Sequence, residues 1–211
     1  MGLRSWLGDR LPVSGQQFRE LTNEPVPYHL KRWWFALGGT PAYLFIVQIF
    51  TGILLAFYYE ASPTTAYESV EYITNEVSFG WYIRSVHKWA ATLMIVAVIL
   101  HQIRVFFTGA YRKPREINWI VGMCLLFATL MTGFTGYSLV YEQLTYWAAT
   151  EGANNSDTHP DVGTFIKRMM QAGDPYNQTT ITPFFIMHAA ELPVTIILIM
   201  EQNITIIRLH P

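Results

Sequence analysis

The chain has 211 residues, of which 51% are hydrophobic and only 14% are charged. Soluble domains carry about 25% charged residues, so this composition argues against a soluble globular protein. The formal net charge is −1, so the charge balance gives no reason to expect nucleic acid as a partner. Length and composition together favour one domain that is embedded in membrane lipid.

Residues 1–32 are rich in charged side chains and contain no long apolar stretch. A secretory signal peptide or a membrane span would need such a stretch. We therefore expect 1–32 to form a cytoplasmic or interfacial segment, and 33–211 to form the membrane domain.

Four stretches are apolar enough to cross a bilayer as helices, which takes about 20 residues each. They cover residues 33–59, 86–107, 119–140 and 183–207. Helices are expected because unpaired backbone groups are costly in lipid. The link 141–182 mixes glycine, proline and asparagine with apolar positions, which favours short amphipathic helices on the membrane surface. The predicted fold class is therefore all-α: a bundle of four transmembrane helices with amphipathic surface helices.

The charges in the links predict the orientation of the bundle. The link between the first two spans is acidic, with Glu60, Glu68, Glu71 and Glu76. Basic residues instead precede the first span, occupy the second link and follow the fourth span: Lys31, Arg32, Arg112, Lys113, Arg115 and Arg208. Since basic residues are retained on the cytoplasmic side, both termini are expected there.

Three histidines lie within the predicted spans. His87 and His101 are fourteen residues apart on the second span, so their rings leave nearly the same helix face, roughly 21 Å apart. His188 and His87 both lie near the outer ends of their spans and can face one another. Two neutral histidines on opposing helices are the ligands of a bis-imidazole haem. The alternative is a set of core histidines, but ionisable groups in membrane helices are costly and usually functional.

Glycines on the first and third spans have a similar period. Gly39 and Gly52 are thirteen residues apart, and Gly122 and Gly136 are fourteen apart. Close helix packing, the alternative explanation, predicts spacings of four. The longer period indicates instead that these glycines give room to the same two flat groups as the histidines.

Several ungapped blocks then resemble the cytochrome b family, most of all its short cytochrome b6 form and the relatives in menaquinol-oxidising bacteria. They are FGWYIRSVHKW (79–89), ILHQIRVF (99–106), TGAYRKPREINWIVG (108–122) and GFTGYSL (133–139). The resemblance implies a haem-binding bundle, with His87 and His188 as ligands of an outer haem b and His101 as a ligand of an inner one. It also implies that the basic residues Arg84, Lys88 and Arg104 lie near haem propionates, and Arg208 near an inner quinone site.

The sequence departs from the family at three places. In the short form, the fourth span carries a second histidine fifteen residues after the first, and this chain has Asn203 at that position. In the long form the second histidine comes fourteen residues after the first, and this chain has Gln202 there. Because an amide is a poor iron ligand, the inner haem is bound through His101 alone, takes a ligand from another chain, or is absent. Ala36 replaces a cysteine that tethers a further haem. Residues 140–142 replace a Pro-Trp-Asp motif that borders the outer quinol site.

The resemblance implies a haem-bearing subunit of a quinol-oxidising electron-transfer complex, with quinol as substrate and no activity of the chain alone. The implied partners are a separate subunit carrying the C-terminal half of cytochrome b, a Rieske iron–sulfur protein and a c-type cytochrome, in a homodimeric complex. Two alternatives remain open from the sequence. The chain could anchor a different redox module, such as a molybdenum oxidoreductase, to the quinone pool, or it could be a haem-poor structural or assembly subunit.

Overall fold

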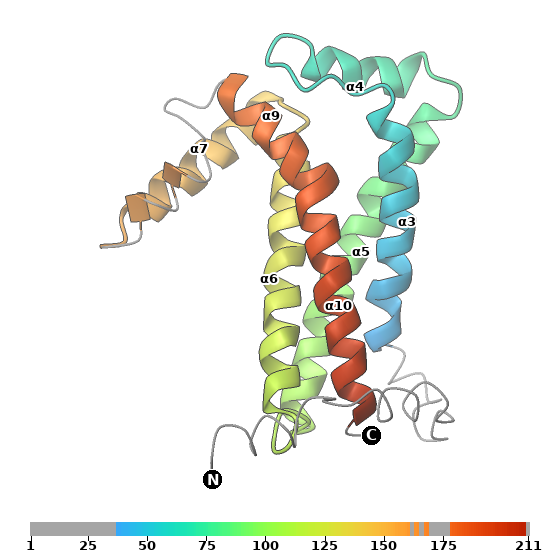
Figure 1. The fold of residues 1–211 in the computed structure, drawn as a ribbon. Helices are drawn as coiled ribbons and strands as arrows, with labels where there is room; N and C mark the ends of the chain where they lie inside the picture. Colours follow the sequence, from blue (N-terminus) through green and yellow to red (C-terminus); the bar gives the residue numbers. More distant parts are fainter. Residues whose placement is uncertain (1–36, 161–162, 165–166, 169–177, 210–211) are drawn as a thin grey trace. The chain divides into compact units, whose positions relative to one another are not determined.

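The computed structural model describes residues 37–160, 163–164, 167–168 and 178–209, and this part of the chain contains helices and no strands. In chain order the helices are α3 (Gly39–Ala56), α4 (Ala66–Asn75), α5 (Gly80–Phe107), α6 (Glu116–Ser138), α7 (Gln143–Asp157), α9 (Gln178–Ile186), the π-helix η3 (Met187–Glu191) and α10 (Leu192–Leu209) (Figure 1). The predicted all-α fold class is confirmed. The predicted segment 1–32 lies outside the described residues.

Four helical stretches are long and apolar enough to cross a membrane. They are Gly39–Ala56, Gly80–Phe107, Glu116–Ser138 and Ile181–Ile207. All four predicted spans are therefore present, although the second helix begins six residues earlier than predicted. Large apolar side chains such as Phe50, Phe107 and Phe127 are exposed on these helices, as a surface in contact with lipid requires. The chain is an integral membrane protein.

The end of α5 is fixed by a local backbone motif. Gly109 has a φ of +66°, a left-handed conformation that costs glycine little. Its N–H bonds to the Phe106 carbonyl, and the N–H of Ala110 bonds to the Val105 carbonyl five residues back. This pair of bonds is a Schellman motif, which satisfies carbonyls at a helix end. It explains why the helix stops at Phe107, as predicted.

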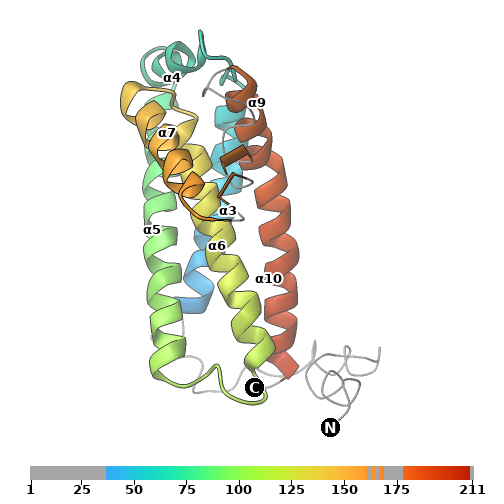
Figure 2. The ribbon, with the colours of Figure 1, turned by 90° about the vertical axis from the view of Figure 1, so that its left-hand side faces the viewer.

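Two helices lie in the links between the spans. α7 falls in the link where short amphipathic helices were predicted, whereas α4, which runs across the direction of α3, was not predicted (Figures 1 and 2). The buried residues of α7 are spaced by four: Thr145, Ala149 and Ala153. Since this spacing follows the helical repeat, α7 buries one narrow stripe of small residues. The apolar positions Phe165, Ile166, Met169 and Met170 lie outside the described residues.

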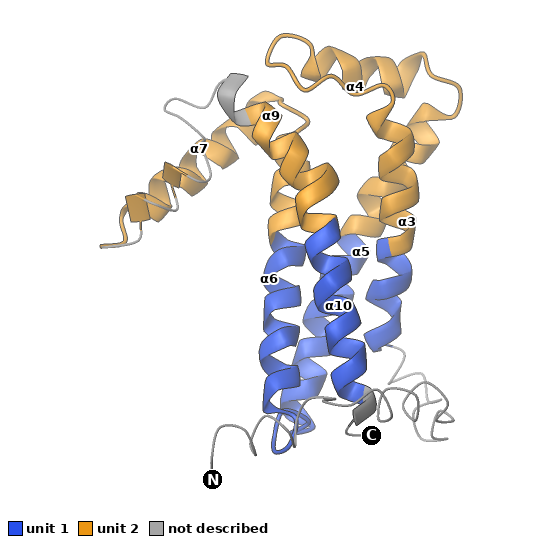
Figure 3. Ribbon diagram, in the orientation of Figure 1, with its two compact units in different colours: residues 1–45, 92–130, 194–211 blue, residues 46–91, 131–193 orange. Residues whose placement is uncertain are grey.

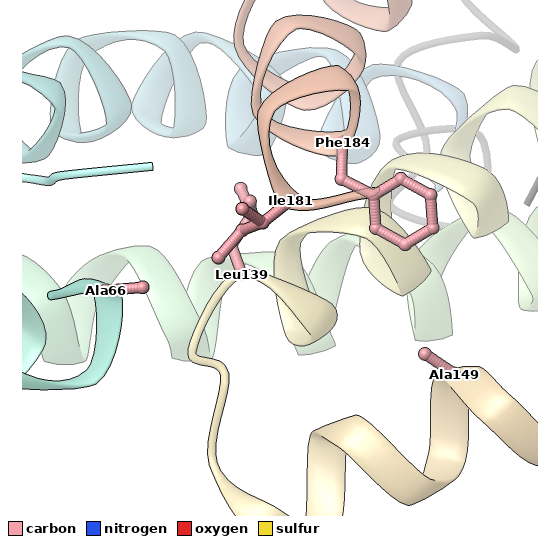
Figure 4. Packing of buried hydrophobic residues seen from close by; sticks show 5 residues of the cluster. All are labelled: Ala66, Leu139, Ala149, Ile181 and Phe184. Carbon is pink, nitrogen blue, oxygen red and sulfur yellow. The ribbon is translucent and has the colours of Figure 1, made fainter. Parts of the chain in front are cut away.

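The chain divides into two compact units, each with segments of all four membrane-spanning helices (Figure 3). Unit 1 comprises residues 1–45, 92–130 and 194–211, and unit 2 comprises residues 46–91 and 131–193. Unit 2 contains a cluster of buried apolar side chains: Ala66, Leu139, Ala149, Ile181 and Phe184 (Figure 4). The Tyr59 hydroxyl packs beside this cluster and donates a hydrogen bond of 2.7 Å to the Leu139 carbonyl.

Replacing Tyr59 with phenylalanine should destabilise unit 2. The change leaves the Leu139 carbonyl without the donor that the structure gives it, and such losses cost about 1 kcal/mol. The expected result is a lower unfolding temperature of the purified protein, with helix content unchanged before the transition. Tyr58→Phe is the matched control, because the neighbouring side chain is 48% exposed. Equal unfolding temperatures for the two variants would contradict a structural role for this hydrogen bond.

Candidate functional site

His188 lies in the short π-helix η3 within the fourth membrane-spanning stretch. Pro193 has no N–H with which to continue the α-helical pattern to Ala189. The N–H of Leu192 instead bonds to the Met187 carbonyl, five residues back. A proline therefore accounts for the local change of helix type. Single π-helical turns inside α-helices are frequent at functional sites.

On α5, His87 is held by two residues of α3 in unit 2. Its ring Nδ1 lies 2.8 Å from the Thr51 hydroxyl, and that hydroxyl donates its own hydrogen to the Val47 carbonyl at 2.7 Å. Because the Thr51 hydrogen is used in this way, the Thr51 oxygen accepts the hydrogen of His87 Nδ1. Gln48 Nε2 also donates to the His87 carbonyl at 2.6 Å. The ring is fixed, and Nε2 is left as its basic nitrogen.

His188 is held in the same way by residues of α6. Its Nδ1 lies 3.0 Å from the Thr132 carbonyl, which can only accept a hydrogen bond. The Thr135 hydroxyl lies 3.4 Å from the same nitrogen and donates to the Met131 carbonyl. The hydrogen of the His188 ring therefore resides on Nδ1. As in His87, Nε2 is the nitrogen available to a metal.

The two rings face each other within unit 2. Their centroids are 6.2 Å apart and their planes make an angle of 72°. Two iron–nitrogen bonds of about 2 Å, together with the half-widths of two imidazole rings, add to about 6 Å. The spacing of the two rings would therefore allow His87 and His188 to hold one haem iron between them. The structure brings together the pair that the sequence predicted.

Glycines of α3 and α6 lie against these rings. A Cβ atom built on Gly52 would lie 3.2 Å from Cε1 of His87, and one built on Gly136 would lie 2.5 Å from Cε1 of His188. The second distance is shorter than a carbon–carbon contact allows, so a larger residue at Gly136 would displace the ring. Both glycines were predicted from their spacing. Their contact with the histidines gives that spacing a physical reason.

In unit 1 the glycine beside His101 is Gly38, one residue before the predicted Gly39. A Cβ atom on Gly38 would lie 3.2 Å from Cε1 of His101, whereas one on Gly39 would have nothing within 4 Å. Gly38 and Gly52 are fourteen residues apart, the same spacing as His87 and His101. That exact match of period was available in the sequence and would have identified Gly38.

The remaining predicted residue of unit 1, Gly122, lies beside amide side chains. A Cβ atom there would be 3.1 Å from Nε2 of Gln102 and 4.0 Å from Nδ2 of Asn203. Asn203 Nδ2 donates to Asn118 Oδ1 at 3.1 Å. His101 Nδ1 is buried, and no described residue forms a hydrogen bond with it. The surroundings of His101 therefore differ from those of His87 and His188.

The predicted basic residues lie on the helices that carry the histidines. Arg84 is half-buried and Lys88 is exposed, both within one turn of His87 in unit 2. Arg104 is half-buried three residues after His101 in unit 1. Arg208 lies in the last turn of α10, and its predicted role concerns a side chain outside the described part. The contacts of these residues with haem propionates or quinone stay predictions.

The segment after α6, where the family motif is replaced, has an unusual backbone. Tyr141 has a φ of +53°, which is uncommon for a residue other than glycine. Its ring packs edge-on against Tyr146, with centroids 6.3 Å apart. Burial raises the pKa of the Tyr141 phenol, and Tyr146 adds to this effect.

The chain is similar to known proteins over nearly its whole length. Residues 21–210 match the model of the family described as "Cytochrome b/b6/petB". Cytochrome b6 of Heliomicrobium gestii is 45% identical over 97% of this chain and 96% of its own, and cytochrome b6 of Emiliania huxleyi is 39% identical over 96% and 94%. A chain of the solved structure "Hyperthermophilic respiratory Complex III" is similar to the present chain, with a TM-score of 0.79 and 26% sequence identity. The match covers 97% of the present chain and 54% of the Complex III chain. The present chain belongs to the cytochrome b family.

Proposed function

We propose that this chain is the haem b-bearing membrane subunit of a quinol-oxidising complex of the cytochrome b6f/bc type, with His87 and His188 as the axial ligands of its outer haem. The facing rings, 6.2 Å apart, carry this proposal. A bound haem b would supply a one-electron carrier inside the membrane. The relatives reported above are cytochrome b6 proteins and a Complex III chain, which favours this function over a membrane anchor for a molybdenum enzyme.

The polypeptide contributes by fixing the ligands before the cofactor binds. Thr51 and the Thr132 carbonyl each accept the Nδ1 hydrogen of one histidine. Such partners orient a ligating ring and raise the basicity of its free nitrogen. Arg84 and Lys88, on the same helix as His87, are proposed to neutralise haem propionates, since a guanidinium or ammonium pairs strongly with a desolvated carboxylate.

The complex is proposed to contain further chains. The present chain covers almost all of the cytochrome b6 relative from H. gestii, but it spans about half the length of the Complex III chain. We propose, as partners, a subunit that carries the C-terminal half of cytochrome b, a Rieske protein and a c-type cytochrome, arranged as a homodimer. The outer quinol site would then need more than this chain, which is not expected to turn over alone.

Quinol-dependent reduction of haem b tests this function. The complex, purified from native membranes, is mixed with a reduced menaquinone analogue while haem b absorbance is followed in a stopped-flow instrument. We expect haem b to be reduced on the time scale of turnover, and the isolated chain to show no steady-state quinol oxidation. Co-purification of a large molybdenum subunit, with no Rieske protein, would instead support the anchor function.

The proposed orientation can be tested separately. Because basic residues are retained on the cytoplasmic side, residues 112–115 should be protected from protease added to intact cells. The acidic link at residues 60–76 should be accessible, as should part of the segment 141–182. The measurement is immunoblotting of an epitope inserted in each link. Cleavage at 112–115 from outside would reverse the assignment, and with it the side on which His87 and His188 lie.

A further inference from the structure

The helices of unit 1 repeat the arrangement of unit 2 with one substitution. In unit 2, Gly52 of α3 lies against His87 of α5, and Gly136 of α6 lies against His188. In unit 1, Gly38, directly before α3, lies against His101 of α5. Gly38 comes fourteen residues before Gly52, and His101 comes fourteen residues after His87. The matching α6 glycine is Gly122, and the side chain of the fourth span that approaches it is Asn203, not a histidine.

Asn203 is held in place by other amides. It donates to Asn118 Oδ1 at 3.1 Å and lies 3.4 Å from the Asn118 carbonyl oxygen. Gln102 approaches the same glycine with its Nε2. We call Gln102, Asn118 and Asn203 the inner amide cluster. It takes the place, beside Gly122, that His188 takes beside Gly136.

The cluster does not fit a bis-imidazole haem. An amide nitrogen has no lone pair to give, and an amide oxygen is a poor ligand for haem iron compared with imidazole. Gln202, the other position at which the family places a histidine, is exposed. Among the described residues of unit 1, His101 is the only histidine. The described part of unit 1 thus offers the inner iron one imidazole donor, His101.

His101 is also less firmly oriented than the outer ligands. Its buried Nδ1 finds no acceptor among the described residues, whereas Nδ1 of His87 is bonded to Thr51. The residue fourteen positions before Thr51 is Leu37, which has no hydroxyl group. Loss of such a partner weakens a ligating histidine. Among the described residues, the inner site therefore has neither a second imidazole ligand nor a hydrogen-bond acceptor that anchors the first.

We propose that the inner site holds haem b through His101 alone, and that the inner amide cluster lines the face on which a small exogenous ligand binds. This inference rests on the proposed function only in taking haem b to be present. Iron with one imidazole is high-spin and accepts a diatomic ligand, and the polarity and donors of the distal side decide which ligand is held. Amide N–H groups suit carbon monoxide, cyanide or nitric oxide, each of which has an acceptor atom.

Carbon monoxide binding to the purified complex tests the proposal. Total haem b per chain is measured as the pyridine adduct, spin state by electron paramagnetic resonance, and ligand binding by the reduced carbon monoxide difference spectrum. We expect half of the haem b to be high-spin and to bind carbon monoxide. Asn203→His should abolish that binding and convert the inner haem to a low-spin form. Wild-type haem that is entirely low-spin and inert, or a stoichiometry of one haem per chain, would overturn the proposal.

Three further variants keep the test decisive. Gln202→His places an imidazole at the adjacent exposed position and should leave carbon monoxide binding unchanged. Asn203→Ala adds no iron ligand and removes one amide from the ligand face, so carbon monoxide should still bind but dissociate faster than from the wild type, a result that can be read even if Asn203→His fails to assemble. His101→Ala should remove the ligand-binding haem, and a carbon monoxide signal that survives it would refute the assignment. The same spectra also measure the low-spin outer haem. If that haem were absent, the result would contradict the proposed function, but not the proposal for the inner haem site.

Discussion

His188→Ala is expected to eliminate the low-spin signal of the outer haem from the purified complex. The change removes one of two rings whose centroids lie 6.2 Å apart, and alanine offers the iron no donor in its place. His87→Ala should have the same effect, because each ring supplies one axial bond. The measurement is a redox titration followed by visible absorbance, in which the lower-potential component should be lost and quinol oxidation abolished.

Two variants separate ligation from general damage. His159→Ala changes an exposed histidine outside the spans, so its spectrum should match the wild type. Thr51→Val keeps the shape of the residue and removes only the acceptor of His87 Nδ1; such losses typically cost about 10-fold or more in metal affinity. A full low-spin signal in both His87→Ala and His188→Ala would show that these rings are not the ligands.

The second large effect is expected for Gly136→Ala. The added methyl group would lie 2.5 Å from Cε1 and 3.0 Å from Nδ1 of His188, so the ring must move away from its bond to the Thr132 carbonyl. Overpacking of this kind costs about 1–3 kcal/mol. At Gly136 it would displace the ring of His188 from the position in which it could bind iron. We expect loss of most of the outer haem from the purified complex, measured as the ratio of low-spin haem to protein.

A graded comparison serves as the control for this prediction. At Gly52 the new methyl group would lie 3.2 Å from Cε1 of His87, a contact that a shift of a few tenths of an ångström relieves. Gly52→Ala should therefore retain more haem than Gly136→Ala. Equal haem content in Gly136→Ala and the wild type would mean that the ring of His188 is free to rotate, contrary to its two hydrogen-bonded contacts.

The sequence predicted the parts of this structure that depend on local pattern. Four apolar stretches indicated the spans, and the positions of His87 and His188 near the outer ends of their spans indicated that these two rings can face one another. The tertiary contacts were not predictable. The bond between Thr51 and His87 joins residues 36 apart, and that between the Thr132 carbonyl and His188 joins residues 56 apart. No periodicity within one helix reveals which threonine meets which ring.

Local elements were also missed where two signals compete. The segment of α4, AYESVEYITN, is too polar for a membrane span, and so it was interpreted only as an acidic link. Gly39 was predicted in place of Gly38, although the spacing of fourteen residues from Gly52 distinguishes Gly38 in the sequence. The departure at Asn203 was visible in the sequence, whereas its hydrogen bond to Asn118 required the structure.

The π-helical turn at Met187–Glu191 bears on how this helix tolerates insertion and deletion. On α3, α5 and α6 the paired positions of the two units recur after fourteen residues, but from His188 to Asn203 they recur after fifteen. A turn with one additional residue absorbs that difference, since each residue of a regular helix adds about 100° of rotation. Deleting one residue from 189–192 would then restore the α-helix and leave Asn203 at its present position, fourteen residues after His188. The π-turn therefore accommodates one residue more than a regular helix would, in the turn that carries His188.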